Sequence, residues 1–177
     1  PKSSTTAPPT SATVLNTTAL SNFAQSDRLD LLLTLPRLVT VEAVQAEVDA
    51  GGETHPYLDR ARAVLETDIP VVTPSERAAT LETQLLETLD PGEAQALAVA
   101  EATDGLLVTD DGDARATATE RGVALTGSIG LLVRFVENDH ITAETADDYL
   151  KRWIDDAGFR SPARDFAVFL DDDEGNC

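Results

Sequence analysis

Short, unbroken apolar runs alternate along this chain with longer segments whose apolar residues recur at helical spacing. The clearest runs are 38–41, 105–109 and 122–126, each with the length of one strand, and weaker ones lie at 13–15 and 69–73. Strands that are apolar along their whole length are buried on both faces, and the segments between these runs are long enough to cross the sheet as helices. The alternation therefore predicts an α/β fold with a central, mostly parallel sheet flanked by helices.

The expected helices have recognisable ends. Asp90, Pro91 and Glu93 fit the N-cap, first and third positions of a helix that should run to about residue 102. The pair Gly51-Gly52 closes a helix that is expected from residue 42. Further helices are expected within 20–35, 56–66, 75–89, 113–121, 128–137, 142–157 and 161–170.

Composition divides the chain into four parts. Residues 1–12 are rich in Pro, Ser and Thr and are expected to form a disordered N-terminal tail, and 171–177 form an acidic tail of the same kind. Between them we expect an α/β domain over 13–140 and a C-terminal helical extension over 141–170. The apolar residues of the extension need a partner surface, which is either the domain itself or a second subunit of a homodimer. These residues are Tyr149, Trp153, Ile154, Phe159, Phe166 and Phe169.

The net charge of the 177-residue chain is −19, from 32 acidic and 13 basic residues. The acids are spread over the whole chain, which favours a surface adapted to molar salt, as in haloarchaeal proteins. At such salt the electrostatic screening length is about 3 Å, so the charge does not exclude a nucleic-acid partner. At low salt the same charge would repel nucleic acid and strain the fold.

The composition also limits the compartment and the metal chemistry. No run approaches 18 apolar residues, and no basic segment precedes an apolar core, so we expect no membrane span, no secretory signal and a cytoplasmic protein. One cysteine, Cys177, excludes a disulfide framework and a cysteine-based zinc site. With only His55 and His140 as imidazoles, carboxylates would have to hold any metal ion.

Polar residues follow the predicted strands at the ends where ligands of open α/β sheets gather. They are Asn16, Thr17 and Thr18 after the first strand, Glu47 one turn into the next helix, Glu93 in a later first turn, and Asp110, Asp111 and Asp113. Two unit charges 4 Å apart cost about 4 kcal/mol at an effective dielectric of 20, so clustered acids there call for a cation such as Mg²⁺ or Mn²⁺. From the residues alone, a solvated acidic face remains the alternative, because this chain has acids everywhere.

Five blocks resemble the PIN-domain family in order and spacing. The opening VLNTTALSNF (14–23) is similar to the family's apolar-apolar-Asp-Thr-Ser/Thr start, and VTVEAVQAEVDAG (39–51) to its second strand and helix. The later blocks LDPGEAQALA (89–98), LLVTDDGDAR (106–115) and VALTGSIGLL (123–132) resemble one branch of the family. Single blocks are loose, but together they cover about 13–170. The resemblance implies a Rossmann-like sheet and a Mg²⁺- or Mn²⁺-dependent ribonuclease for single-stranded RNA, often the toxin of a toxin–antitoxin pair.

The resemblance also implies roles for particular residues. Metal ligands are expected at Asn16, Glu47, Glu93 and Asp110, with Asp111 and Asp113 as rivals for the last position. Glu47, Glu93, Asp110 and Asp111 would be the catalytic acids, and Thr17 and Thr18 would position water or substrate. Ordinary structural roles compete for three of these acids. Asp111 could be an N-cap, Asp113 could interact with a helix dipole, and Glu93 could complete a capping box.

Asn16 departs from the family pattern, which has an aspartate there. An asparagine keeps one oxygen ligand and nearly the same shape but loses the charge. Two hypotheses follow: an attenuated nuclease, or a non-catalytic PIN scaffold that binds RNA or a protein partner. A third class, the receiver or phosphatase type of phosphotransfer domain, needs a lysine on a later strand, whereas Lys2 and Lys151 lie in the N-terminal tail and the last helices.

Overall fold

The computed structural model describes residues 6–52 and 54–174, without the side chains of 171–174. Its contacts group the chain into two compact units, Pro1–Thr126 and Gly127–Cys177. Each unit is described by itself. The first contains the sheet and the helices α1 to α7, and the second contains the helices α8 to α10.

Five short strands of the first unit form one parallel sheet in the order β3-β2-β1-β4-β5. They are β1 (Thr13–Leu15), β2 (Leu38–Val41), β3 (Val71–Val72), β4 (Leu106–Val108) and β5 (Ala124–Thr126). In the register, Val14 lies opposite Val39, and Leu15 lies opposite Val108. The predicted α/β fold with a parallel sheet is confirmed, and because all strands are parallel their carboxyl ends meet at one edge.

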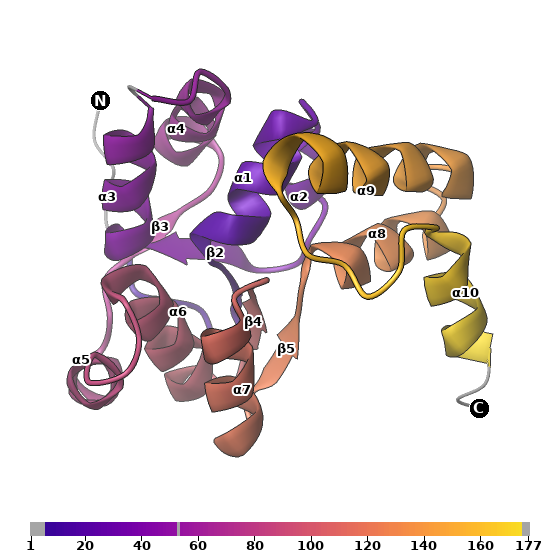
Figure 1. Ribbon diagram of the computed structural model, residues 1–177. Coiled ribbons are helices and arrows are strands. Elements are labelled where there is room, and N and C mark those ends of the chain that lie inside the picture. The colour runs from indigo at the N-terminus through magenta and orange to yellow at the C-terminus, as the bar shows by residue number, and fades with distance from the viewer. Residues whose placement is uncertain (1–5, 53, 175–177) are drawn as a thin grey trace. The chain divides into compact units, whose positions relative to one another are not determined.

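In the described part of the first unit, seven helices surround this sheet. They are α1 (Thr17–Gln25), α2 (Leu29–Leu32), α3 (Glu42–Gly51), α4 (Tyr57–Thr67), α5 (Glu76–Leu85), α6 (Pro91–Ala102) and α7 (Gly112–Glu120). Figure 1 shows α1 and α4 on one side of the sheet and α6 and α7 on the other. Helices on both faces explain why β1, β2 and β3 and most of β4 are buried, whereas the edge strand β5, which we expected to be buried as well, is exposed to half-buried.

Helix α6 is the most deeply buried helix-forming segment of the first unit. Its residues 94–100 are all buried, and most of them are small, so the helix packs closely against β1, α3 and α5. The predicted capping box is present. The Glu93 N–H donates to Asp90 Oδ1 at 3.0 Å, and the Asp90 N–H donates to Glu93 Oε2 at 3.3 Å.

The segment 6–12 differs from the expected disordered tail. Thr6 forms an isolated parallel bridge with Val72, the Ser11 N–H donates to the Thr103 carbonyl at 2.7 Å, and Ala12 is fully buried. Composition did not predict this pairing, because it depends on the free backbone groups of β3 at the sheet edge. Residues 1–5 of the expected tail lie outside the described residues.

The second unit consists of α8 (Ser128–Glu137), α9 (Ala143–Ala157) and α10 (Ala167–Glu174). Helix α8 packs with α9 and α10, although we expected it to belong to a domain over 13–140. Trp153 and Phe166, two of the apolar residues that needed a partner surface, are fully buried. Helix α10 begins later than the expected 161 and continues into the expected acidic tail, of which 175–177 lie outside the described residues.

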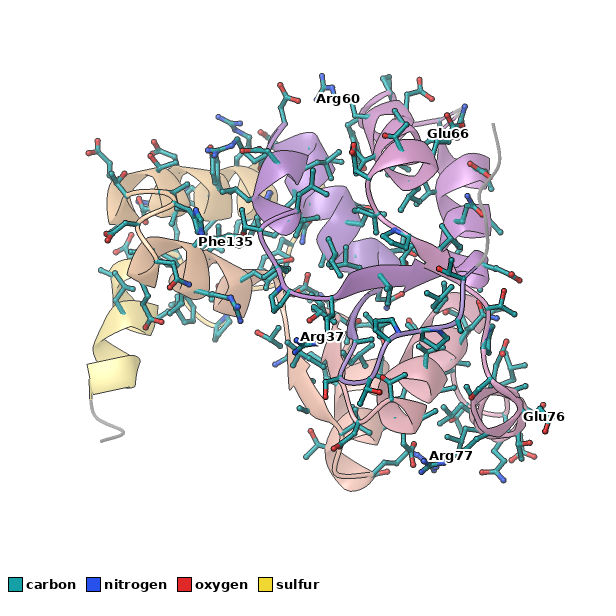
Figure 2. All side chains as sticks on the ribbon, turned by 180° about the vertical axis from the view of Figure 1, so that it is seen from behind. Arg37, Arg60, Glu66, Glu76, Arg77 and Phe135 are labelled. Atoms are coloured by element: carbon teal, nitrogen blue, oxygen red, sulfur yellow. The ribbon has the colours of Figure 1, made fainter. Side chains whose placement is uncertain are left out.

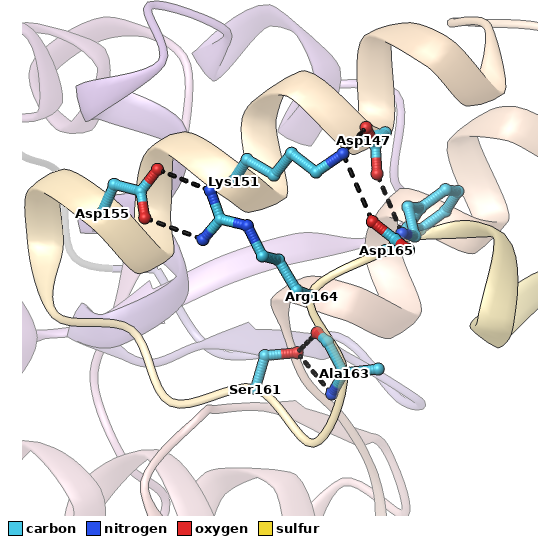
Figure 3. Close-up of polar contacts among 8 residues, drawn as sticks. Asp147, Lys151, Asp155, Ser161, Ala163, Arg164 and Asp165 are labelled. Atoms are coloured by element: carbon cyan, nitrogen blue, oxygen red, sulfur yellow. Dashed lines mark hydrogen bonds and ion pairs between the residues drawn. The ribbon is translucent and has the colours of Figure 1, made fainter.

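Ion pairs hold the segment between α9 and α10 against α9 (Figure 3). Lys151 Nζ lies 2.6 Å from Asp147 Oδ2 and 3.4 Å from Asp165 Oδ1. Arg164 donates two hydrogen bonds to Asp155, of 2.8 and 2.9 Å. Each of these acids therefore lies beside a cation.

Charged side chains cover the outer faces of the helices. Figure 2 shows Arg60 and Glu66 on α4, and Glu76 and Arg77 on α5, among many other exposed charges. Among the described residues, no helix is both long and apolar enough to cross a membrane.

Candidate functional site

The carboxyl edge of the sheet brings together residues that are far apart in the sequence. The Asn16 N–H, directly after β1, donates to the Val108 carbonyl of β4 at 2.9 Å. Glu47 lies in the helix that follows β2, and Glu93 in the first turn of α6. A series of hydrogen bonds, described below, joins these elements at the edge where ligands of such folds bind.

Asn16 is 2% exposed and serves as the N-cap of α1. Its Oδ1 accepts a hydrogen bond of 2.8 Å from the Thr17 N–H, and its Nδ2 donates one of 2.9 Å to Thr109 Oγ1. The Thr109 hydroxyl oxygen also accepts the Asp111 N–H at 3.2 Å. The Asn16 amide therefore links the start of α1 to the chain that follows β4.

The carboxylate of Glu47, which is half-buried, contacts two other helices. The Thr17 hydroxyl donates a short hydrogen bond to Oε2, and the Gly92 N–H donates one of 3.2 Å to Oε1. These donors belong to the first turns of α1 and α6, where backbone N–H groups lack helical partners and attract anions. Glu47 thus joins the first turn of α6 to Thr17, the residue that follows Asn16.

Glu93 shares a hydrogen bond with the Asp111 side chain, and its pKa is raised to about 8. Burial is the largest cause, the Asp90 N–H opposes it, and the negative charges of Asp90 and Asp111 raise the pKa further. Without a cation, the Glu93 carboxyl is therefore protonated in most molecules at neutral pH. A divalent ion beside these acids would favour the release of the Glu93 proton.

Asp110 is half-buried and faces α1. Its N–H donates to Thr18 Oγ1 at 2.9 Å, and Asn22 Nδ2 donates to Asp110 Oδ2 at 3.2 Å. Thr18 therefore fixes the backbone of the acid that follows β4, whereas Thr17 contacts the acid on α3.

The two rivals for the last acid position lie in different surroundings. Asp111 caps α7 by accepting the Ala114 N–H at 2.9 Å, and it also interacts with Glu93. Asp113 is exposed in the first turn of α7, and its carbonyl accepts the Thr117 hydroxyl at 2.8 Å. The structure thus brings Asp111 to the other acids and gives no such contact for Asp113.

The carboxylate and amide oxygens of these residues are chemically suited to bind a hard divalent cation. Among the described side chains, no three carboxylate or imidazole groups lie close enough together to enclose a metal ion. Glu93 instead meets Asp90 and Asp111, whose negative charges act on its carboxyl. Carboxylate and amide oxygens are the ligands that Mg²⁺ and Mn²⁺ prefer, and Mg²⁺ commonly keeps several of its waters. We call the residues Asn16, Glu47, Glu93, Asp110 and Asp111 the acidic edge.

Sequence reasoning missed several residues that build this edge. Thr109 is fully buried and joins Asn16 to Asp111, as shown above. Gln95 Oε1 accepts the Ala43 N–H at 2.8 Å and thereby anchors the first turn of α3, the helix of Glu47. The available signal for Gln95 was a polar side chain among the small apolar residues of 94–100.

The parallel sheet and the acidic edge define the class of protein, an α/β domain with oxygen donors at the carboxyl edge of its sheet. Within that class, the model of the family described as "DUF3368: PIN domain" matches residues 12–173. The chain belongs to the PIN-domain family, as its sequence blocks had indicated.

Two solved structures are similar to the chain. VapBC-1 from nontypeable Haemophilus influenzae is 16% identical, with a TM-score of 0.49 and coverage of 66% of this chain and 98% of that chain. VapBC2 from Rickettsia felis, solved with a DNA fragment from its promoter, is 15% identical, with a TM-score of 0.48 and the same coverage. No curated protein matches the chain.

Proposed function

We propose that this protein is a Mg²⁺- or Mn²⁺-dependent endoribonuclease of PIN type, a hydrolase that cleaves single-stranded RNA. One observation carries the proposal: hydrogen bonds join polar groups from α1, α3, α6 and the segment after β4 at one edge of the sheet. Membership of the PIN-domain family supports the nuclease class. We further propose that the protein acts in the cytoplasm, in molar salt, as the toxin partner of an antitoxin protein.

The residues of the acidic edge divide the work. Glu47, Glu93 and Asp110 would hold the ion, with Asp111 as the additional acid in place of the exposed Asp113. Because no three of these groups lie close enough together to enclose an ion, some of them would bind it through its waters. A bound ion would supply the Lewis acidity that phosphodiester hydrolysis needs. Glu93 would release its proton when the ion binds. Thr17 and Thr18 would keep Glu47 and the backbone of Asp110 in place.

Substrate binding needs a positively charged side chain as well as the acids, because RNA is a polyanion. Arg115 follows Asp111 by four residues, and its Nη1 donates to the Thr109 carbonyl at 3.0 Å. This contact holds the half-buried guanidinium next to the acidic edge, where it could meet a phosphate. Molar salt would weaken repulsion between the RNA and the rest of the −19 surface.

Asn16 is expected to reduce activity. It offers a neutral oxygen that already accepts the Thr17 N–H. By the Coulomb estimate, loss of one charge beside a divalent ion costs several kcal/mol at most, and less in strong salt. Ion binding should therefore be weak and should need millimolar Mn²⁺.

The same observation favours a second candidate, a PIN scaffold that binds RNA or a protein without cleaving RNA. The Asn16 side chain uses both its donor and its acceptor within the protein, as a purely structural residue would. The two candidates differ in what Asn16→Asp should do. The nuclease should gain ion affinity and cleavage, whereas the scaffold should gain neither.

The test is cleavage of single-stranded RNA by the full chain in molar KCl with Mn²⁺. We expect slow cleavage by the wild type, faster cleavage by Asn16→Asp, and none by Asp110→Asn. Glu66→Gln, which removes an exposed acid of α4, should match the wild type. Cleavage that persists in Asp110→Asn would rule out this site, and no Mn²⁺ binding by either wild type or Asn16→Asp would support the scaffold.

A further inference from the structure

Gly92, the second residue of α6, lies directly against the carboxylate of Glu47. A Cβ atom built on Gly92 would lie 2.4 Å from Glu47 Oε1 and 2.7 Å from Glu47 Cδ and Oε2. Carbon and oxygen atoms that are not bonded cannot approach so closely. The position of this carboxylate therefore depends on the missing side chain at residue 92.

The backbone of Gly92 also binds the same carboxylate. Its N–H donates to Glu47 Oε1 at 3.2 Å, while the Thr17 hydroxyl donates to Oε2. A hydrogen bond to an ionised acceptor is stronger than one between neutral groups. Gly92 thus contributes both a donor and the space that allows the acceptor to reach it.

We propose that Gly92 is a positioning residue for Glu47, which sets the affinity of the acidic edge for a divalent cation by holding the Glu47 carboxylate against the first turn of α6. The inference rests on the proposed function and deepens it. The next residue, Glu93, belongs to the same turn, so the turn that binds the Glu47 carboxylate also carries Glu93. A flexible Glu47 carboxylate would have to be ordered by the ion, whereas this one is ordered before the ion binds.

The structure indicates that alanine at position 92 should move the carboxylate without unfolding the protein. Gly92 has helical backbone geometry and no positive φ, so alanine is compatible with its conformation. The atoms that a Cβ would meet are the end of a flexible side chain, which can rotate away. Alanine is also a better helix former than glycine.

Gly112 offers a matched control. Gly112 is the first residue of α7 and Gly92 the second residue of α6, so both lie in the first turn of a helix. Both helices have an aspartate N-cap. A Cβ on Gly112 would meet no atom within 4 Å. Gly112→Ala therefore reproduces the change in helix propensity without a displaced carboxylate.

The experiment is calorimetric titration of the full chain with Mn²⁺ in molar KCl, together with thermal unfolding. Gly92→Ala should weaken Mn²⁺ binding by about tenfold or more, the usual loss when a group that orients a ligand is changed. Its Tm should equal or exceed that of the wild type. Gly112→Ala should bind Mn²⁺ like the wild type.

A double variant tests whether the effect passes through Glu47. In the Glu47→Gln background, Gly92→Ala should cause no further loss of affinity, because the carboxylate it displaces is already absent. An equal loss in both backgrounds would overturn the proposal, as would a Gly92→Ala protein with wild-type affinity.

A measurement without metal separates this proposal from the proposed function. The amide proton resonance of Gly92 in metal-free protein should move upfield in Glu47→Gln, because a charge-assisted hydrogen bond is lost, and should stay in place in Glu66→Gln. If the wild type binds no Mn²⁺, the proposed function fails, and a Gly92 resonance that moves still supports the positioning of Glu47. A resonance that does not respond to Glu47→Gln overturns it.

Discussion

The acids at the carboxyl edge of the sheet and the acids of α9 differ in the charge of their neighbours, which is negative at the edge and positive on α9. On α9, Lys151 lowers the pKa of Asp147 through a hydrogen bond, and Arg164 does the same for Asp155. At the edge, Glu93 faces Asp90 and Asp111, and its pKa rises to about 8. The paired acids serve the packing of the second unit. The edge keeps acids together at a cost in stability, which is typical of a functional site.

The largest effect should come from Glu93→Gln, which removes the acid with negative neighbours and so abolishes the difference between the two regions. Glutamine keeps the shape and can still accept the Asp90 N–H, but it cannot offer a carboxylate to an ion. RNA cleavage should fall by at least about 100-fold, because loss of a ligand should cost no less than the loss of a group that orients one. The unfolding midpoint in denaturant should stay equal or rise, because a half-buried acid beside two others is removed. A parallel loss of stability would show that Glu93 is structural.

Asn16→Ala should have the next largest effect, on stability. The substitution removes the N-cap of α1 and the donor to Thr109, whose hydroxyl is buried. An N-cap contributes about 1 kcal/mol, and the lost hydrogen bond to Thr109, which would still accept the Asp111 N–H, contributes a similar amount, so the free energy of unfolding should fall by about 2 kcal/mol. Urea unfolding measures this change. Asn16→Asp, which can still cap α1, is the control and should lose much less.

The smallest effect should appear in the pH dependence of stability without metal. Because the folded state raises the Glu93 pKa from 4.5 to about 8, it binds more protons than the unfolded chain in this range. The contribution of Glu93 to stability should therefore fall as pH rises from 4.5 to 8. Asp147, whose folded pKa is below 3.8, should contribute stability above that pH and lose it as pH falls further.

Urea unfolding between pH 2 and 9, with a chelator present, separates the two regions. Glu93→Gln should flatten the slope between pH 4.5 and 8, and Asp147→Asn should flatten only the acid side. Both groups are partly solvated, which makes each effect small. The same slope in Glu93→Gln and wild type would contradict the raised pKa of Glu93.

The sequence was sufficient to predict those features of the fold that depend on local signals. Strand positions followed from short apolar runs, and the start of α6 followed from Asp90, Pro91 and Glu93. The clustering of Asn16, Glu47 and Glu93 was inferred from the rule that parallel strands share a carboxyl edge, together with the family resemblance. Hydrogen bonds at that edge join the elements that carry these residues, while the shared site and its ion stay predictions.

The remaining features depend on contacts between residues that are far apart in the sequence, which local patterns do not encode. The role of Gly92 depends on Glu47, 45 residues earlier in the chain. The contact of Asp111 with Glu93 depends on how α6 and α7 pack, so the sequence left Asp111 and Asp113 as equals. The pairing of Thr6 depends on the open edge of β3, and composition could not show that edge.

The most direct test of the acidic edge is anomalous scattering from crystals of the full chain grown in molar KCl with Mn²⁺. The account predicts a manganese peak at the carboxyl edge of the sheet, bound directly or through its waters by oxygens of Glu47, Glu93 and at least one of Asp110 and Asp111. A crystal with no manganese there, or with manganese only on acids elsewhere on the surface, would contradict it.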